Sequence, residues 1–176
     1  MNILATILTV LFGIVTLLLI TALFMKKEYN IQCEIIINKP LQNVFDYVKH
    51  IKNWDNFNKW AMADLDCKRE YKGTDGTVGF IYAWSGNKKA GEGEKEIMTI
   101  SEGNKIETEI RFIKPFKLIG QNNLTTESIS SNQTKVTLMN KSKLKYPLNI
   151  LIPMIEKGFP KDMITSLSTL KNILEK

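Results

Sequence analysis

The sequence predicts an α+β domain carried behind one apolar N-terminal helix. Three observations predict this class. The first 25 of the 176 residues contain no Lys, Arg, Asp or Glu. From Cys67 onward, apolar and polar residues alternate between turn signals, as they do in antiparallel strands. The last part of the chain returns to helical spacing, so one long helix is left to cover the apolar face of the sheet.

The N-terminal segment from Ile3 to Met25 is apolar apart from its threonines and would extend roughly 34 Å as a helix, enough to cross a bilayer. No basic residue precedes it and its end lacks a small-x-small cleavage site, which favours an uncleaved anchor over a cleaved signal peptide. Lys26 and Lys27 follow directly, so the positive-inside rule places the domain in the cytoplasm. We expect a single-pass membrane protein with an anchor over residues 1–27 and one domain over residues 28–176.

Composition limits the partners of that domain. The formal net charge is +6, but Arg69 and Arg111 are the only arginines, and lysine lacks the planar fork that reads bases. Nucleic acid is therefore not expected as a partner. No Gly-x-Gly-x-x-Gly or Gly-Lys-Ser/Thr motif is present, and the sole histidine, His50, leaves no basis for a catalytic triad or a zinc site. We expect no cofactor, no metal and no catalytic residue.

The helices and strands follow from periodicity. A strand over 31–37 precedes Pro40, which begins a helix whose apolar positions share one face. A second short helix is predicted over 53–60. About six strands follow, and near the C-terminus Gly158 is predicted to end a short helix and Pro160 to begin a longer one.

The strand that contains Glu92, Glu94 and Glu96 allows two interpretations. A solvated acidic face is favoured, but if Glu94 pointed inward it would be the leading buried acid for acid–base chemistry. Met98 and Ile100 place Glu94 on the apolar face, whereas Ile97 supports the opposite register. The sequence leaves this phase open.

These motifs together resemble a known superfamily. They are Ile35-Ile36-Ile37-Asn38-Lys39-Pro40, Val44-Phe45-Asp46-Tyr47-Val48, Asn53-Trp54 through Trp60, Gly91-Glu92-Gly93, and Leu167 to Leu170 with Lys171 and Leu174. Over residues 28 to 176 the chain resembles the SRPBCC superfamily of START domains, the birch-pollen allergen and polyketide cyclases. It looks most like a bacterial polyketide cyclase/dehydrase-like subgroup with one membrane span. The resemblance implies a helix-grip fold, in which a curved antiparallel sheet wraps a long C-terminal helix around a largely apolar cavity.

An aromatic and methionine set is the candidate lining of that cavity, and a filled core is the competing interpretation. The candidate ligand-binding residues are Trp60, Phe80, Tyr82, Trp84, Phe112, Met154, Phe159 and Met163.

We therefore expect a membrane-tethered protein that binds a hydrophobic small molecule or lipid. One alternative is an enzyme of the cyclase, aromatase or hydrolase type, which would require Glu94, Tyr82 or Asp66 to converge inside the cavity. Another is a scaffold with a packed interior and an exposed apolar patch. Two sets of lysines, beside Tyr146 and around Pro115-Phe116, either contact lipid headgroups or are simply solvated.

Overall fold

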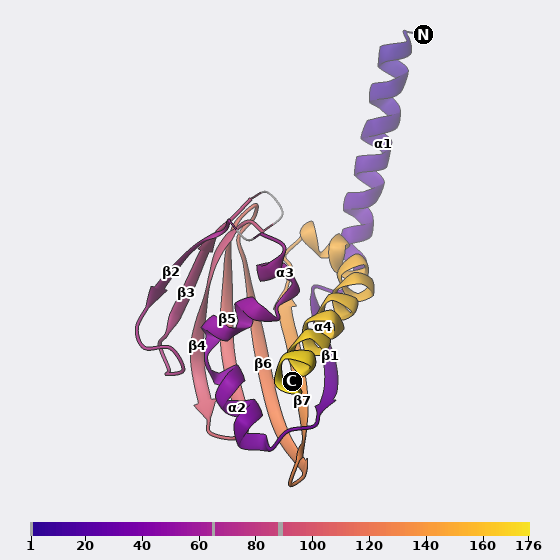
Figure 1. Ribbon diagram of the computed structural model, residues 1–176. Coiled ribbons are helices and arrows are strands. Elements are labelled where there is room, and N and C mark those ends of the chain that lie inside the picture. The colour runs from indigo at the N-terminus through magenta and orange to yellow at the C-terminus, as the bar shows by residue number, and fades with distance from the viewer. Residues whose placement is uncertain (1, 65, 88–89) are drawn as a thin grey trace.

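The computed structural model describes residues 2–64, 66–87 and 90–176. Among these residues, seven antiparallel strands form one curved sheet in the order β1-β7-β6-β5-β4-β3-β2. The sheet bends around the long helix α4 (Ile152–Leu174), which packs mainly against β1 (Figure 1). The predicted α+β helix-grip fold is confirmed. The strands are β1 (Glu28–Ile37), β2 (Lys68–Lys72), β3 (Ile81–Ser85), β4 (Glu92–Ser101), β5 (Lys105–Lys114), β6 (Leu118–Ser130) and β7 (Gln133–Lys143).

Strand register determines which residues face the helices. Tyr82 on β3 pairs with Lys95 on β4, and Lys95 pairs with Ile110 on β5. Ile110 pairs with Gly120 on β6, which pairs with Ser142 on β7. These five buried residues form one row across the concave inner face, because paired residues in a sheet project to the same side. The residues on either side of each of them point to the convex outer face.

The helices between β1 and β2 cover part of the inner face. Helix α2 (Leu41–Lys49) buries Val44, Phe45 and Val48, as its apolar spacing predicts. The predicted helix over 53–60 is instead two pieces, a 3₁₀ turn η1 (Ile51–Asn56) and the short helix α3 (Lys59–Met62). Asn58 caps α3 by accepting hydrogen bonds from two backbone N–H groups, and this cap begins a new helix where the sequence suggests continuity.

The prediction of a helix break near Gly158 is wrong. Helix α4 follows the 3₁₀ turn η2 (Leu148–Leu151) and runs without interruption through both Gly158 and Pro160. Proline removes one backbone hydrogen bond from a helix interior. Met163, Leu167 and Leu170, one and more turns beyond it, are buried against the sheet. We attribute the continuity of the helix to this packing.

A bulge explains the conflicting phase in β4. The register between β4 and β5 shifts between Ile97 and Thr99, so one extra residue is inserted at Met98. Ile97 is fully buried, Met98 is exposed, and Ile100 returns to pack against the core. Before the bulge the inward residues are therefore Gly93, Lys95 and Ile97. Glu94 lies on the outer face, which agrees with the favoured interpretation of a solvated acidic face.

The N-terminal helix α1 (Ile3–Phe24) extends away from the domain (Figure 1) and is long and apolar enough to cross a membrane. A signal sequence near an N-terminus can meet the same criteria of length and apolar composition. The C-terminal end of α1 contacts the domain. The side-chain amide of the buried Asn149 donates hydrogen bonds to the carbonyls of Ala22, at 2.6 Å, and Met25, at 3.2 Å. Lys26 pairs with Glu156 of α4 at 2.6 Å.

Candidate functional site

A cavity of about 360 Å³ lies between the inner face of the sheet, the η1–α3 segment and α4. Its volume falls at the low end of the range for small-molecule sites. The floor is the middle of the inner row, where Ile110 and Gly120 leave room above β5 and β6. Ile155 and Phe159 of α4 close one side. The interior is thus not completely filled by side chains, unlike the packed interior that the scaffold alternative requires.

Aromatic rings form much of the cavity wall. Trp84 meets Phe112 edge to face, with ring centroids 5.7 Å apart, and Trp60 stacks on Phe159 at 4.7 Å. The Trp84 ring lies directly against Gly93 on the neighbouring strand. A Cβ atom at Gly93 would lie 2.6 Å from that ring, so only glycine permits this approach.

Of the eight residues that the sequence predicts to line the cavity, some line it and others lie in the core or on the surface. Five of them line the cavity: Trp60, Tyr82, Trp84, Phe112 and Phe159. Phe80 and Met163 are buried in the core, where Phe80 stacks on Tyr71. Met154 is 66% exposed near the start of α4 and lies outside the cavity lining. Alternation along β3 placed Phe80 with Tyr82, but it could not show where along the strand the cavity ends.

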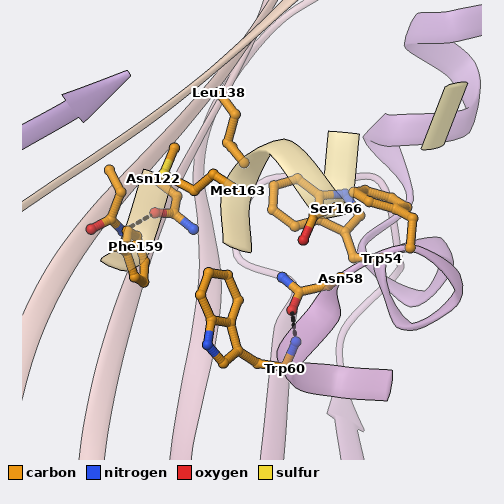
Figure 2. A pocket seen from close by; sticks show the side chains of 10 residues that line it. Trp54, Asn58, Trp60, Asn122, Leu138, Phe159, Met163 and Ser166 are labelled. Atoms are coloured by element: carbon orange, nitrogen blue, oxygen red, sulfur yellow. Dashed lines mark hydrogen bonds between the residues drawn. The ribbon is translucent and has the colours of Figure 1, made fainter. Parts of the chain in front are cut away.

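A second, much smaller pocket of about 20 Å³ lies beneath α4 (Figure 2). Met163, Leu138 and Ser166 line it, together with Asn122 and Asn140, which also line the large cavity. The side-chain amide of Asn140 donates to the side-chain oxygen of Asn122. This space is enough for about one water molecule, so it is not a ligand site by itself.

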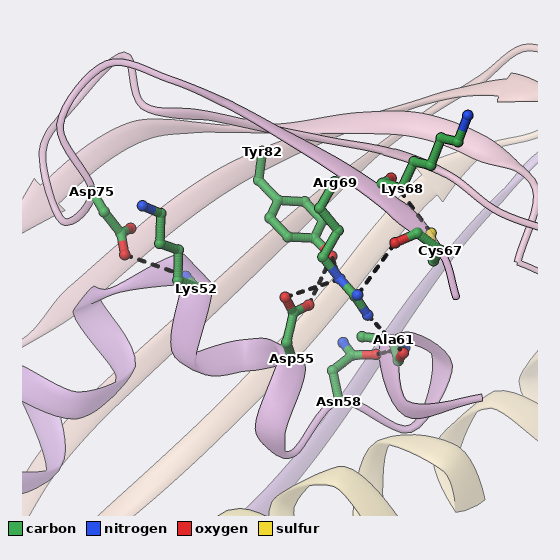
Figure 3. Close-up of polar contacts among 9 residues, drawn as sticks. All are labelled: Lys52, Asp55, Asn58, Ala61, Cys67, Lys68, Arg69, Asp75 and Tyr82. Carbon is green, nitrogen blue, oxygen red and sulfur yellow. Dashed lines mark hydrogen bonds and ion pairs between the residues drawn. The ribbon is translucent and has the colours of Figure 1, made fainter. Parts of the chain in front are cut away.

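A polar cluster closes the cavity beside β2 and β3 (Figure 3). The Tyr82 hydroxyl donates to Asp55 Oδ1 at 2.7 Å, and Arg69 Nε lies 3.1 Å from Asp55 Oδ2. The remaining Arg69 nitrogens donate to the backbone carbonyls of Cys67 and Ala61. Burial, followed by the hydrogen bond to Asp55, raises the pKa of Tyr82 well above its usual value. Arg69 thereby fixes edge strand β2 to η1 and α3, and all its nitrogens are engaged.

Lys95 brings a second cation into the cavity from β4. Its side chain is 8% exposed, and its Nζ lies 4.1 Å from the centroid of the Trp54 ring. The Trp54 indole is fixed in turn by a 2.7 Å hydrogen bond from Nε1 to the carbonyl of Val48. Burial lowers the pKa of Lys95 to about 8, although the negative charge of Asp55 acts in the opposite direction. Among the residues that the structure describes, none accepts a hydrogen bond from this ammonium.

The convergence that the enzyme alternative required is not observed. Glu94 lies on the outer face and pairs with Arg111 at 2.5 Å, and Asp66 is exposed. Of the three residues, only Tyr82 lines the cavity. The sequence reasoning missed Asp55, Arg69 and Lys95. Lys95 could have been found from the outward assignment of Glu94, because the next residue in a strand points to the opposite face. Nothing in the sequence indicates the position of Asp55, which only the tertiary fold brings to Tyr82.

The cavity reaches the surface at one end of the sheet. Strand β1 begins at Glu28, close to the end of α1, and Glu28 pairs with Lys143 at the end of β7. Antiparallel pairing brings the start of β4, the end of β5 and the start of β6 to this same end, which we call the anchor end. Here Phe116, 40% exposed, and Trp60, 36% exposed, border the cavity. The mouth of the cavity therefore lies at the end of the domain from which α1 extends.

Fold and site together define a helix-grip protein with a largely apolar cavity in which, among the described residues, Lys95 has no hydrogen-bond acceptor for its ammonium. No family model and no curated protein matches the chain. Solved structures do match it. Truncated norcoclaurine synthase from Thalictrum flavum is 10% identical, has a TM-score of 0.66, and is matched over 84% of this chain and 93% of that one.

Two further structures are similar. The protein Ara h 8.0201 is 12% identical, with a TM-score of 0.60 and coverage of 84% of this chain and 97% of that one. A protein from Nitrosospira multiformis is 14% identical, with a TM-score of 0.59 and coverage of 82% and 94%. At such identities the likeness shows the fold alone, which is the helix-grip fold.

Proposed function

We propose that this chain is a membrane-tethered protein that binds a small hydrophobic molecule or a lipid in its cavity. The observation that carries the proposal is the cavity of about 360 Å³, whose aromatic wall suits an apolar ligand. Its volume favours a single chain or ring system over a complete two-chain lipid. Trp60, Tyr82, Trp84, Phe112 and Phe159 are the residues that we assign to ligand contact.

The contact between α1 and the domain supports an uncleaved anchor over residues 1–27 followed by a domain over residues 28–176. Ala22 is fully buried, and Asn149 satisfies carbonyl groups at the end of α1 that a helix leaves without intrahelical partners. Cleavage after this helix would leave the Asn149 amide buried without its acceptors. With Lys26 and Lys27 at the end of the span, we assign the domain to the cytoplasmic side of the membrane.

The surface around the cavity mouth supports uptake of the ligand from the bilayer. Ile113, Phe116 and Ile119 are exposed on the hairpin between β5 and β6, with Lys114 and Lys117 beside them. Apolar side chains flanked by lysines suit an interface with anionic lipid headgroups. The hairpin lies at the anchor end, so the tether holds it near the membrane. A ligand that partitions into the bilayer would then be concentrated close to the mouth.

Filling the cavity tests this function. Gly120 is buried in its floor, and a Cβ there would meet its nearest neighbours at 3.7 Å and 3.8 Å, an ordinary contact distance. Gly120→Leu should therefore fold and place a side chain in the ligand space. The matched control is Gln121→Leu, which adds the same side chain to the outer face of the same strand.

Full-length protein is purified in mild detergent, and bound molecules are identified by native mass spectrometry with lipid extraction. We expect a stoichiometric small apolar ligand in the wild type and in Gln121→Leu, and its loss in Gly120→Leu, while the three proteins stripped of ligand show similar thermal unfolding. A wild type without any bound or bindable apolar molecule, or equal occupancy in Gly120→Leu, would overturn the proposal.

A further inference from the structure

We propose that the ligand is an amphipathic acid, whose carboxylate binds Lys95 and whose apolar body lies along the aromatic wall toward the mouth. This inference rests on the proposed function, because it specifies the chemical class of the molecule in the same cavity. Four features support it: the position of Lys95, the lack of an acceptor for its ammonium among residues 2–64, 66–87 and 90–176, the existing partners of the neighbouring charges, and the direction of the apolar wall.

The first feature is the position of Lys95 in the middle of the inner row. It lines the cavity between Tyr82 on β3 and Ile110 on β5, and it is more than nine-tenths buried. The face of Trp54 covers one side of the ammonium. An aromatic face attracts a cation but accepts no conventional hydrogen bond from it, so the three N–H donors still require oxygen acceptors.

The charged groups beside Lys95, Asp55 and Arg69, form an ion pair with each other. Asp55 is the carboxylate nearest to this side of the cavity, and its two oxygens are occupied by the Tyr82 hydroxyl and by Arg69 Nε. The other two nitrogens of Arg69 donate hydrogen bonds to backbone carbonyls. Asp55 is therefore engaged by Arg69 and Tyr82. The second carboxylate of the cavity lining, Asp64, accepts a hydrogen bond from the backbone N–H of Asn87. The Lys95 ammonium is left without a carboxylate of its own among the described residues. An anionic group from outside the chain is the complement that this arrangement requires.

A carboxylate meets the requirement better than a neutral oxygen. Hydrogen bonds between two ionised groups are roughly twice as strong as neutral ones, and the low dielectric of a closed cavity increases the difference. The acid is accordingly held by its head at Lys95, while the Asp55, Tyr82 and Arg69 cluster forms the adjacent wall.

The apolar wall gives the ligand its orientation. The next inward row of the sheet, one step closer to the mouth than the row of Lys95, consists of Trp84, Gly93 and Phe112. Gly91 lines the cavity at the mouth and precedes Lys95 by four residues. At the usual rise along a strand, the mouth is therefore about 13 Å from Lys95. The acid thus enters head first, and a medium-length acyl chain fills the distance back to Phe116 at the anchor end.

The experiment compares an acid with an uncharged analogue of the same chain. Binding of dodecanoate and of dodecanol to full-length protein is titrated by native mass spectrometry from a non-ionic detergent. The variants are Lys95→Met and the matched control Lys52→Met. Lys52 lies on η1 (Figure 3). It also lies over an aromatic ring, at 4.5 Å from the Tyr71 centroid, but it is exposed and is not among the residues that line the cavity.

Lys95→Met should weaken dodecanoate binding roughly 10- to 100-fold, the usual value of a charge-assisted hydrogen bond, and change dodecanol binding less than about twofold. Lys52→Met should bind both as the wild type does. Equal dodecanoate binding by the wild type and Lys95→Met, with dodecanol also bound, overturns the acidic ligand and leaves the hydrophobic cavity intact. A wild type that binds neither compound overturns the proposed function as well.

A second measurement needs no variant. The groups around the ammonium are Asp55 on η1, Tyr82 on β3 and Arg69 on β2. Burial lowers the pKa of Lys95 to about 8, whereas the pKa values of Tyr82 and Arg69 are raised above their usual values and so move further from neutral pH. Dodecanoate should bind most tightly below about pH 8 and more weakly as the pH rises above that value, while dodecanol binding stays constant. Dodecanoate binding that is independent of pH across this interval overturns the assignment to Lys95.

Discussion

Two cations on neighbouring strands, Arg111 on β5 and Lys95 on β4, lie on opposite faces of the same sheet. On the convex face, Arg111 contacts Glu94, Glu96 and Glu109 at 2.5 to 2.6 Å, and these hydrogen bonds, Glu96 first, raise its pKa. On the concave face, Lys95 has no carboxylate partner among the described residues, and burial lowers its pKa to about 8. Arg111 on the outer face stabilises the fold through its ion pairs, whereas the ammonium of Lys95 on the inner face is available to bind a ligand.

The contrast predicts opposite effects on stability, and the largest belongs to Lys95. The lowered pKa of Lys95 means that burying this ammonium lowers the free energy of unfolding by about 3 kcal/mol at neutral pH. Methionine fills similar space without a charge, and losing the contact with Trp54 costs up to about 1 kcal/mol. Lys95→Met should therefore raise the free energy of unfolding by about 2–3 kcal/mol at pH 7.

Urea unfolding in detergent, followed by tryptophan fluorescence, measures this change, with Lys52→Met as the control. Destabilisation by Lys95→Met would break the comparison, because it would make the inner cation part of the structural framework, as Arg111 is.

The outer cation should behave in the opposite way. Arg111→Met leaves three partly buried glutamates close together without their shared partner, which should lower the free energy of unfolding by about 2 kcal/mol. Lys105→Met is a suitable control, since Lys105 makes a single ion pair with Glu107 on the same face, and such pairs contribute less than about 1 kcal/mol. The same unfolding experiment applies. Equal effects at Arg111 and Lys105 would show that the three-glutamate network adds nothing.

The sequence predicts the outer face better than the inner one, for a physical reason. The sequence favoured an outward, acidic face for Glu92, Glu94 and Glu96, although Met98 and Ile100 left the phase of β4 open, and the structure places these glutamates on the outer face. The inner face depends on where the bulge at Met98 falls and on which side chains leave space unfilled. A bulge has no distinct composition here, and a cavity arises from packing between segments distant in sequence. The fold class, α1 and the strands were therefore predictable, but the pairing of Asp55 with Arg69 was not.

Helix α4 also shows that local sequence signals do not determine the tertiary structure. Gly158 and Pro160 are local signals for a helix end, and both are overruled by burial of the residues beyond them against the sheet. Local rules describe what a segment prefers in isolation, and tertiary contacts decide when that preference is weak.

A substitution in the polar cluster around Arg69 should change stability less than the substitutions of Lys95 and Arg111. Tyr82→Phe removes the hydroxyl that donates to Asp55 and accepts from Arg69 at 3.2 Å. The Asp55–Arg69 ion pair remains, so the free energy of unfolding should fall by only about 1.5 kcal/mol. Because this hydroxyl makes no contact with the Lys95 ammonium, the preference for dodecanoate over dodecanol should persist. Loss of that preference in a folded Tyr82→Phe protein would show that the acid binds to the cluster rather than to Lys95.

The smallest expected effect tests the charge state of Lys95 directly. An exposed lysine titrates near 10.5, and Lys95 in the folded protein titrates at about 8. Between these values the unfolded chain binds more protons than the folded one, so the free energy of unfolding of the wild type rises with pH. Methionine does not titrate, and Cys33 and Cys67, whose pKa values burial raises, contribute equally to both proteins. The stability advantage of Lys95→Met should therefore shrink by about 1 kcal/mol between about pH 7 and pH 9, as measured by urea unfolding of both proteins. An advantage that stays constant or grows would mean that Lys95 keeps its proton as firmly as the paired Arg111, and the distinction between the two faces would then fail.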